Sequence, residues 1–203
     1  FMFFGMFGSI FLLSQFFQTV QGYSPFGSGL RILPWTLAPM FIAPLAGALA
    51  DRIPPKLLIG TGLALQSVAL AWIGLVSEPT TPYRELVVPF VVAGVGMALF
   101  FAPMAYVVLS AVRPEQEGQA SGANNAIREL GGVFGVAVLA SVFARVGGYE
   151  SGEAFVDGMN PAILIGAAVV GLGALAAFAI PRRRRPDEAP ALRPELEPLP
   201  EAA

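Results

Sequence analysis

The chain has 203 residues, of which 55% are hydrophobic and only 13% are charged, and its formal net charge is −2. A typical soluble domain carries about 25% charged residues, so water is not the main solvent of this fold. The sequence contains no cysteine and no histidine, which excludes disulfides, thiolate or imidazole metal sites and histidine acid–base chemistry. We expect no cofactor and no metal.

Six apolar segments are long enough to cross a bilayer. A hydrocarbon core about 30 Å thick requires about 20 helical residues at a rise of about 1.5 Å each. Helices of a soluble core are the alternative, but such helices carry one charged face, whereas the third and sixth segments carry no charge at all. The sequence predicts an all-α polytopic membrane protein with a transmembrane domain over residues 1–181. The predicted spans are residues 1–20, 30–50, 57–77, 86–110, 119–145 and 161–180.

The two ends of the chain have their own signals. Phe1 leads directly into the first apolar segment, without the basic stretch and cleavage site of a signal peptide, so we expect a piece of a longer protein. Four arginines at 182–185 directly follow the sixth segment, where a membrane anchor is a simpler interpretation than a nuclear signal or a nucleic-acid patch. Residues 182–203 are predicted to be a basic anchor and a disordered cytoplasmic tail, because the Pro, Glu and Ala that dominate the tail build no core. We expect no nucleic-acid partner.

Lysine and arginine near the helix ends predict the orientation. With the tail in the cytoplasm, the inner loops hold Arg52, Lys56, Arg113 and the run 182–185, whereas the outer loops hold Arg31, Arg84 and Arg145. The basic excess therefore lies inside. We expect a multi-pass protein of the plasma (inner) membrane with both ends of this chain cytoplasmic.

The first predicted helix carries a polar and aromatic stripe. At 100° per residue this stripe consists of Gly8, Phe11, Gln15, Gln18, Thr19 and Gly22. Gln15 and Gln18 are therefore candidates for lining a substrate cavity, and hydrogen bonding between helices is an equally open alternative for them.

Three prolines recur at intervals of five in the second predicted helix, at Pro34, Pro39 and Pro44. Proline removes a backbone donor and kinks a helix, and membrane helices tolerate it where neighbours satisfy the freed carbonyl groups. We expect this helix to be bent.

The stretch GALADRIPPK, residues 47–56, follows the second span. It resembles the loop motif G-x-L-a-D-R-x-G-R-K between the second and third helices of major facilitator halves, although Pro54 and Pro55 replace the usual glycine and first basic residue. In that family the loop latches the cytoplasmic side through charge contacts. The resemblance thus implies a conformational latch formed by Gly47, Asp51, Arg52 and Lys56. We also expect Gly47 to let another helix approach closely; a charged cap at the membrane boundary is the alternative.

Two further stretches resemble one branch of that superfamily, the fourteen-helix drug:proton antiporters. Residues 11–34 carry an aromatic-Gln segment followed by G-Y-S-P and G-L-x-x-L-P, and residues 118–139 (GQASGANNAIRELGGVFGVAVL) resemble the fifth helix of the C-terminal half. The resemblance implies the C-terminal six-helix half of a major facilitator fold, built as a 3+3 inverted repeat.

The fifth predicted helix has one polar, small-residue face around Arg128. This face holds Ser121, Asn124, Asn125, Arg128, Gly131, Gly132 and Gly135. Arg128 lies about 25 Å along the axis from Arg145, just inside the inner bilayer boundary. A buried arginine costs about 2.5–3.5 kcal/mol at the bilayer centre, so Arg128 either snorkels or faces a watery cavity, and the neighbouring glycines favour a cavity or a helix interface. We predict that Asn124, Asn125 and Arg128 line a cavity, with Glu129 as a local partner of Arg128.

The middle of each predicted span contains no Asp or Glu, although proton coupling needs a titratable group there. The resemblance implies export of amphipathic small molecules or drugs, with protons coupled through a missing N-terminal half, where this family commonly carries that carboxylate. The expected partners are the lipid bilayer, a small-molecule substrate and those protons. We expect no enzyme, because an intramembrane protease needs a histidine base or a pair of carboxylates. A channel subunit or a membrane scaffold is the alternative.

Overall fold

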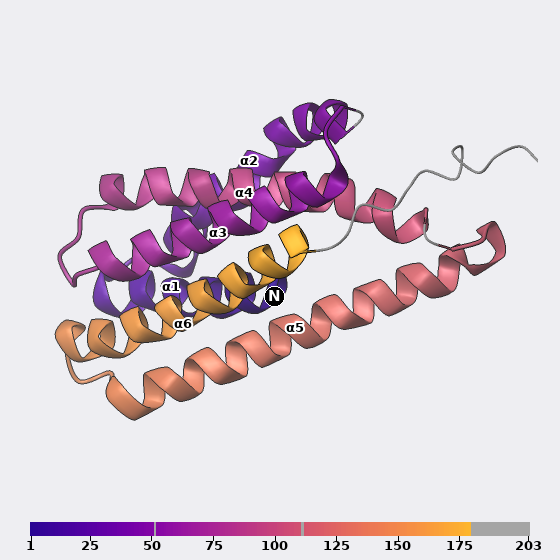
Figure 1. The fold of residues 1–203 in the computed structure, drawn as a ribbon. Helices are drawn as coiled ribbons and strands as arrows, with labels where there is room; N and C mark the ends of the chain where they lie inside the picture. The colour runs from indigo at the N-terminus through magenta and orange to yellow at the C-terminus, as the bar shows by residue number, and fades with distance from the viewer. Residues whose placement is uncertain (51, 111, 180–203) are drawn as a thin grey trace, which may run out of the picture.

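Six long helices make up the computed structural model, which describes residues 1–50, 52–110 and 112–179 (Figure 1). All six are long and apolar enough to cross a membrane, which confirms the predicted all-α membrane class. Their bounds are α1 Met2–Gln15, continued by the π-helical segment η1 Phe16–Val20, α2 Pro25–Ala50, α3 Pro55–Val76, α4 Tyr83–Leu109, α5 Glu117–Val146 after the 3₁₀ turn η2 Pro114–Gln116, and α6 Gly152–Ala179.

Two helices begin at least five residues earlier than the sequence analysis predicts. α2 begins at Pro25 rather than at 30, and α6 begins at Gly152 rather than at 161. A serine caps each of these starts: the Ser24 hydroxyl accepts from the Gly27 amide at 3.1 Å, and the Ser151 hydroxyl accepts from the Ala154 amide at 3.1 Å. These caps extend both helices through residues that were expected to be loop. The predicted basic anchor and tail, 182–203, lie outside the described residues.

The helix packing repeats within the chain. α1 packs against α5 and α6, α4 packs against α2 and α3, and α3 packs against α6. Exchanging α1, α2 and α3 for α4, α5 and α6 maps these pairs onto one another, as the expected 3+3 repeat requires. Two pairs lack a counterpart: α5 packs on α6 whereas α2 makes little contact with α3, and α1 contacts α3 whereas α4 makes little contact with α6.

Glycines allow the closest helix approaches. A Cβ built on Gly8 of α1 would lie 2.8 Å from the carbonyl oxygen of Gly135 in α5, and one on Gly135 would collide with the backbone of Phe4. Between α3 and α4, a Cβ on Gly62 or on Gly96 would lie 2.6 Å from the carbonyl oxygen of the other residue. Small residues let membrane helices pack backbone against backbone, so these positions determine how closely the helices sit.

α2 and α5 are the least buried helices. In the most apolar stretch of each helix, 17% of the residues are buried in α2 and 22% in α5, compared with 44–50% in the other four. α2 runs as one helix through its three internal prolines, and its expected bend stays a prediction. Both helices thus present long faces that the rest of the described chain does not cover.

Candidate functional site

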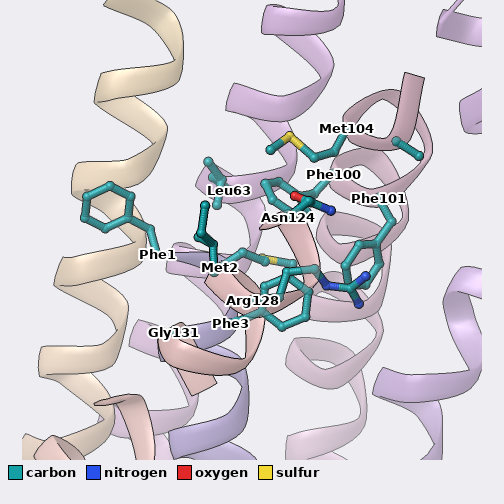
Figure 2. A pocket seen from close by; sticks show the side chains of 12 residues that line it. Phe1, Met2, Phe3, Leu63, Phe100, Phe101, Met104, Asn124, Arg128 and Gly131 are labelled. Carbon is teal, nitrogen blue, oxygen red and sulfur yellow. The ribbon is translucent and has the colours of Figure 1, made fainter. Parts of the chain in front are cut away.

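A cavity of about 240 Å³ lies between the first turn of α1, the second half of α4 and the first half of α5 (Figure 2). Among the described residues, Arg128 is the only charged side chain that lines it, and Asn124 contributes the only uncharged polar side chain. The remaining surface is apolar or aromatic. The lining residues are Phe1, Met2, Phe3, Leu63, Phe100, Phe101, Met104, Ala105, Asn124, Ile127, Arg128 and Gly131.

Glycines on α5 let α1 pack closely beside Arg128. A Cβ on Gly131 would lie 3.4 Å from the Cβ of Phe3, one on Gly132 would lie 3.0 Å from the Phe7 ring, and Gly135 sits against the Phe4 backbone. The small-residue face that the sequence places around Arg128 is therefore in part a helix interface. Because α1 packs closely on this face of α5, the Phe3 ring lies against the Arg128 guanidinium.

The Arg128 guanidinium lies against two aromatic rings (Figure 2). Its Cζ is 4.5 Å from the Phe3 ring centroid and 5.3 Å from that of Phe101, and the two rings are 5.4 Å apart. These distances are within the range of cation–π attraction. The side chain is half-buried, its Nε is buried without a hydrogen-bond partner, and no carboxylate of the described residues forms an ion pair with it.

The expected pairing of Arg128 with Glu129 is wrong within the described part of the chain. Glu129 lines a different hollow, with Phe7 and Gly132. Consecutive residues of a helix point about 100° apart, so neighbours in sequence do not face each other.

Only one of the two asparagines that were predicted to line a cavity lines this one. Asn124 lies one helical turn before Arg128 and lines the cavity with it, whereas Asn125 is exposed and is not among the lining residues. The polar face predicted for α5 is thus divided between this cavity and the open side of the helix.

Gln15 and Gln18 lie far from Arg128, about 18 Å or more beyond Phe3 along α1. Gln15 Oε1 accepts a 2.6 Å hydrogen bond from the Tyr149 hydroxyl, while Gln18 Nε2 donates to the carbonyl and hydroxyl oxygens of Ser14 at 3.1 and 3.0 Å. Their stripe is interrupted because η1 is a π-helix, in which the Gln21 amide donates to the Phe16 carbonyl five residues back. A projection at 100° per residue fails across such a segment. The structure does not bring either glutamine to the Arg128 cavity.

Comparison of the sequence with known protein families shows to which family the chain belongs. The sequence model of the Major Facilitator Superfamily matches residues 1–202. The chain belongs to the major facilitator superfamily.

Several relatives of this major facilitator chain are named for multidrug resistance or multidrug export. It is 38% identical over 142 residues to the multidrug resistance protein Stp of Mycobacterium tuberculosis, an alignment that covers 70% of this chain and 26% of that protein. It is 28% identical over 139 residues to the multidrug export protein EmrB of Escherichia coli, covering 68% and 27%. It is 26% identical over 156 residues to the probable multidrug resistance protein EmrY of Escherichia coli, covering 76% and 30%. The chain thus spans less than a third of the length of each of these relatives.

The predicted latch of this major facilitator chain is only partly described. Arg52 is exposed in the turn after α2, Lys56 is half-buried in the first turn of α3, and Asp51 lies outside the described residues. Around Gly47, no described atom outside its own stretch of helix lies within 4 Å of where a Cβ would sit. The expectation that Gly47 admits a close helix therefore stays a prediction. The latch itself stays a prediction.

The sequence analysis missed a second cation–aromatic site, at the opposite end of α1. The Cζ of Arg31 lies 3.2 Å from the Tyr23 ring centroid and 5.5 Å from that of Tyr83. Arg31 Nη1 donates to the Gly27 carbonyl at 3.1 Å, and the Tyr83 hydroxyl donates to the Arg31 carbonyl at 3.0 Å. These contacts join the start of α2 to the start of α4. Tyr23 lies before the start of α2, so helical spacing does not give its contact with Arg31, and no local pattern gives the contribution of Tyr83.

Proposed function

We propose that this chain is the C-terminal six-helix half of a secondary transporter, which exports amphipathic small molecules or drugs by proton antiport together with a second half. The proposed location is the plasma membrane, with both ends of the chain cytoplasmic. The bilayer, the substrate and the coupled protons are the proposed partners.

The observation that carries this proposal is the cavity at Arg128. One cationic and one amide side chain, set among aromatic and aliphatic groups, suit a molecule with a polar group and an apolar body. Arg128 lies about 27 Å along the axis before the end of α5 at Val146. In the proposed orientation the cavity therefore lies toward the cytoplasm, where an exporter collects its substrate.

The exposed faces of α2 and α5 support a second half. These two helices are counterparts in the internal repeat, and both are less buried than the other four. The open side of α5 carries polar residues, among them Ser121, Asn125 and Glu129, which are all exposed. Lipid tails offer polar side chains no hydrogen-bond partners, so a protein partner or an aqueous cavity suits this face better. The two halves of a major facilitator protein pair around an axis normal to the membrane, with substrate near the midplane.

Proton coupling is assigned to the second half. The carboxylates of the described spans lie near helix starts, as Glu85, Glu117 and Glu153 do, or on exposed positions, as Glu129 and Asp157 do. A group that alternates between the two sides of a membrane has to reach its middle.

Flux measurements on the full-length protein test the proposal. Reconstituted in proteoliposomes, it should move at least one drug of a panel of anionic, neutral and cationic compounds against its gradient, and only when a proton gradient is imposed. Downhill flux that is independent of the proton gradient would favour the channel alternative. Absence of flux for every compound of the panel would favour a scaffold and overturn the proposal.

A further inference from the structure

The charge of the Arg128 cavity indicates which compounds it takes. We propose that this cavity binds the anionic group of a small aromatic acid, with a carboxylate on the Arg128 guanidinium and the ring among the neighbouring aromatic side chains. This inference rests on the proposed function, because it names a substrate class for the same transporter.

The guanidinium is available to an anion. Its Nε is buried without a hydrogen-bond partner, and no described carboxylate pairs with it. The Phe3 and Phe101 rings attract the positive charge through their faces but accept no strong hydrogen bond from its N–H groups. A carboxylate matches the planar donors of an arginine with two parallel hydrogen bonds, and such charge-assisted bonds are stronger than neutral ones.

Asn124 supplies a second donor on the same wall. It lies four residues before Arg128 on α5 and lines the same cavity, and side chains at this spacing are neighbours on a helix. Figure 2 shows its amide group above Arg128 in this view, and Phe100 lines the same cavity. An oxygen atom held by Arg128 is therefore within reach of an amide donor as well.

The rest of the cavity suits an aromatic body. Phe100, Met104 and Leu63 line the side away from the guanidinium, and aromatic rings and thioether groups both pack favourably on an aromatic ligand. A volume of about 240 Å³ accommodates one or two fused rings rather than an extended drug.

The same lining disfavours a cation. None of the twelve lining residues is acidic, and the neighbouring Glu129 belongs to another hollow. A cationic ligand would face the arginine at close range in a site of low dielectric, where repulsion between like charges is large.

Calorimetric titration of the full-length protein in phosphatidylcholine nanodiscs tests the assignment. The probes are 2-naphthoate, the neutral 2-naphthamide and the cationic 2-naphthylmethylammonium, which share one ring system. We expect naphthoate to bind at least about tenfold more tightly than the amide, and the cation to bind more weakly than both. Equal affinities of the three compounds, or tightest binding of the cation, would overturn the assignment.

Variants of α5 test whether naphthoate binds at this cavity. Arg128→Met should weaken naphthoate binding by about tenfold or more and leave naphthamide binding nearly unchanged, and Arg128→Lys should have an intermediate effect because it keeps the charge but not the planar donors. Arg145→Met removes a charge from an exposed position of the same helix and should leave the affinity for naphthoate unchanged. Naphthoate binding that survives Arg128→Met, or that falls equally in both variants, would overturn the assignment. The comparison of the three probes on the unmodified protein decides the matter if Arg128→Met fails to fold.

The two proposals can fail separately. Proton-driven flux of a drug of the panel without naphthoate binding would overturn the anion site and leave the proposed function standing. Naphthoate binding that depends on Arg128, without proton-driven flux of naphthoate or of any drug of the panel, would overturn the proposed function and support the anion site.

Discussion

The Tyr149 hydroxyl donates a 2.6 Å hydrogen bond to Gln15 Oε1, which joins the α5–α6 loop to the last turn of α1. The Tyr149 ring also packs against Phe143 and Phe155, with centroids at 5.2 and 5.7 Å. Gln15 therefore acts, at this end of the bundle, as a link between helices. This is the hydrogen-bonding alternative that the sequence left open for it.

Removing this hydrogen bond should cost a small, measurable amount of stability. In a double-mutant cycle of Tyr149→Phe and Gln15→Leu, we expect a coupling energy of about 0.5–1.5 kcal/mol in the free energy of unfolding. SDS unfolding of the full-length protein measures it. Tyr149→Phe keeps the ring packing, so the coupling reports on the hydroxyl. A coupling energy of zero would show that the two residues do not interact in the membrane protein.

Gly135→Ala should destabilise the contact between α1 and α5. The added methyl group collides with the Phe4 backbone, which cannot rotate away, and overpacking of this kind costs about 1–3 kcal/mol. The matched control is Gly122→Ala on the same helix, where no described atom lies within 4 Å of the added Cβ. The melting temperature of the detergent-solubilised full-length protein should fall for Gly135→Ala only.

Gly22→Ala should destabilise the turn between η1 and α2. Among the described residues, Gly22 is the one glycine with a positive φ, 70°, in a region where an L-residue with a Cβ costs about 1–2 kcal/mol. Gly29→Ala is the control, because it lies within α2 and its added Cβ meets nothing within 4 Å among the described residues. A fall in melting temperature that is equal in both variants would exclude a backbone effect specific to Gly22.

Cysteine labelling tests the proposed orientation, and this chain contributes no cysteine of its own. In the full-length protein, after replacement of any cysteine elsewhere, Glu150→Cys between α5 and α6 should react with a membrane-impermeant maleimide on intact cells. Glu115→Cys, in the turn before α5, should react only after the cells are permeabilised. Both positions are exposed, so accessibility within the fold does not separate them. The opposite labelling pattern would invert the topology.

Arg128→Ala should impair export without impairing membrane insertion. The guanidinium contacts Phe3 of α1 and Phe101 of α4 from α5, so its removal alters both the charge and the packing of the cavity. Proton-driven flux at equal protein level in the membrane is the measurement, with Arg113→Ala, an exposed position before η2, as the control. Unchanged flux for Arg128→Ala would remove Arg128 from the transport pathway.

The sequence by itself determined the class of this protein, because the number and length of apolar segments depend only on local composition and on the thickness of a bilayer. The sequence also contains two helix-capping serines that were not used to predict where the helices begin. Ser24 and Ser151 are helix caps, and they explain why α2 and α6 begin at Pro25 and Gly152.

Only the tertiary structure decided which residues share a site. Arg128 was selected from its own helix, but Phe3 and Phe101, which complete its surroundings, come from helices more than twenty residues away in sequence, and no local pattern encodes such contacts. Helical periodicity grouped Asn124 with Asn125 and Gln15 with Gln18. The packing of α1 on α5 and the π-helical turn at η1 separated them, because the direction in which a side chain points depends on the local helix geometry and its contacts depend on the neighbouring helix.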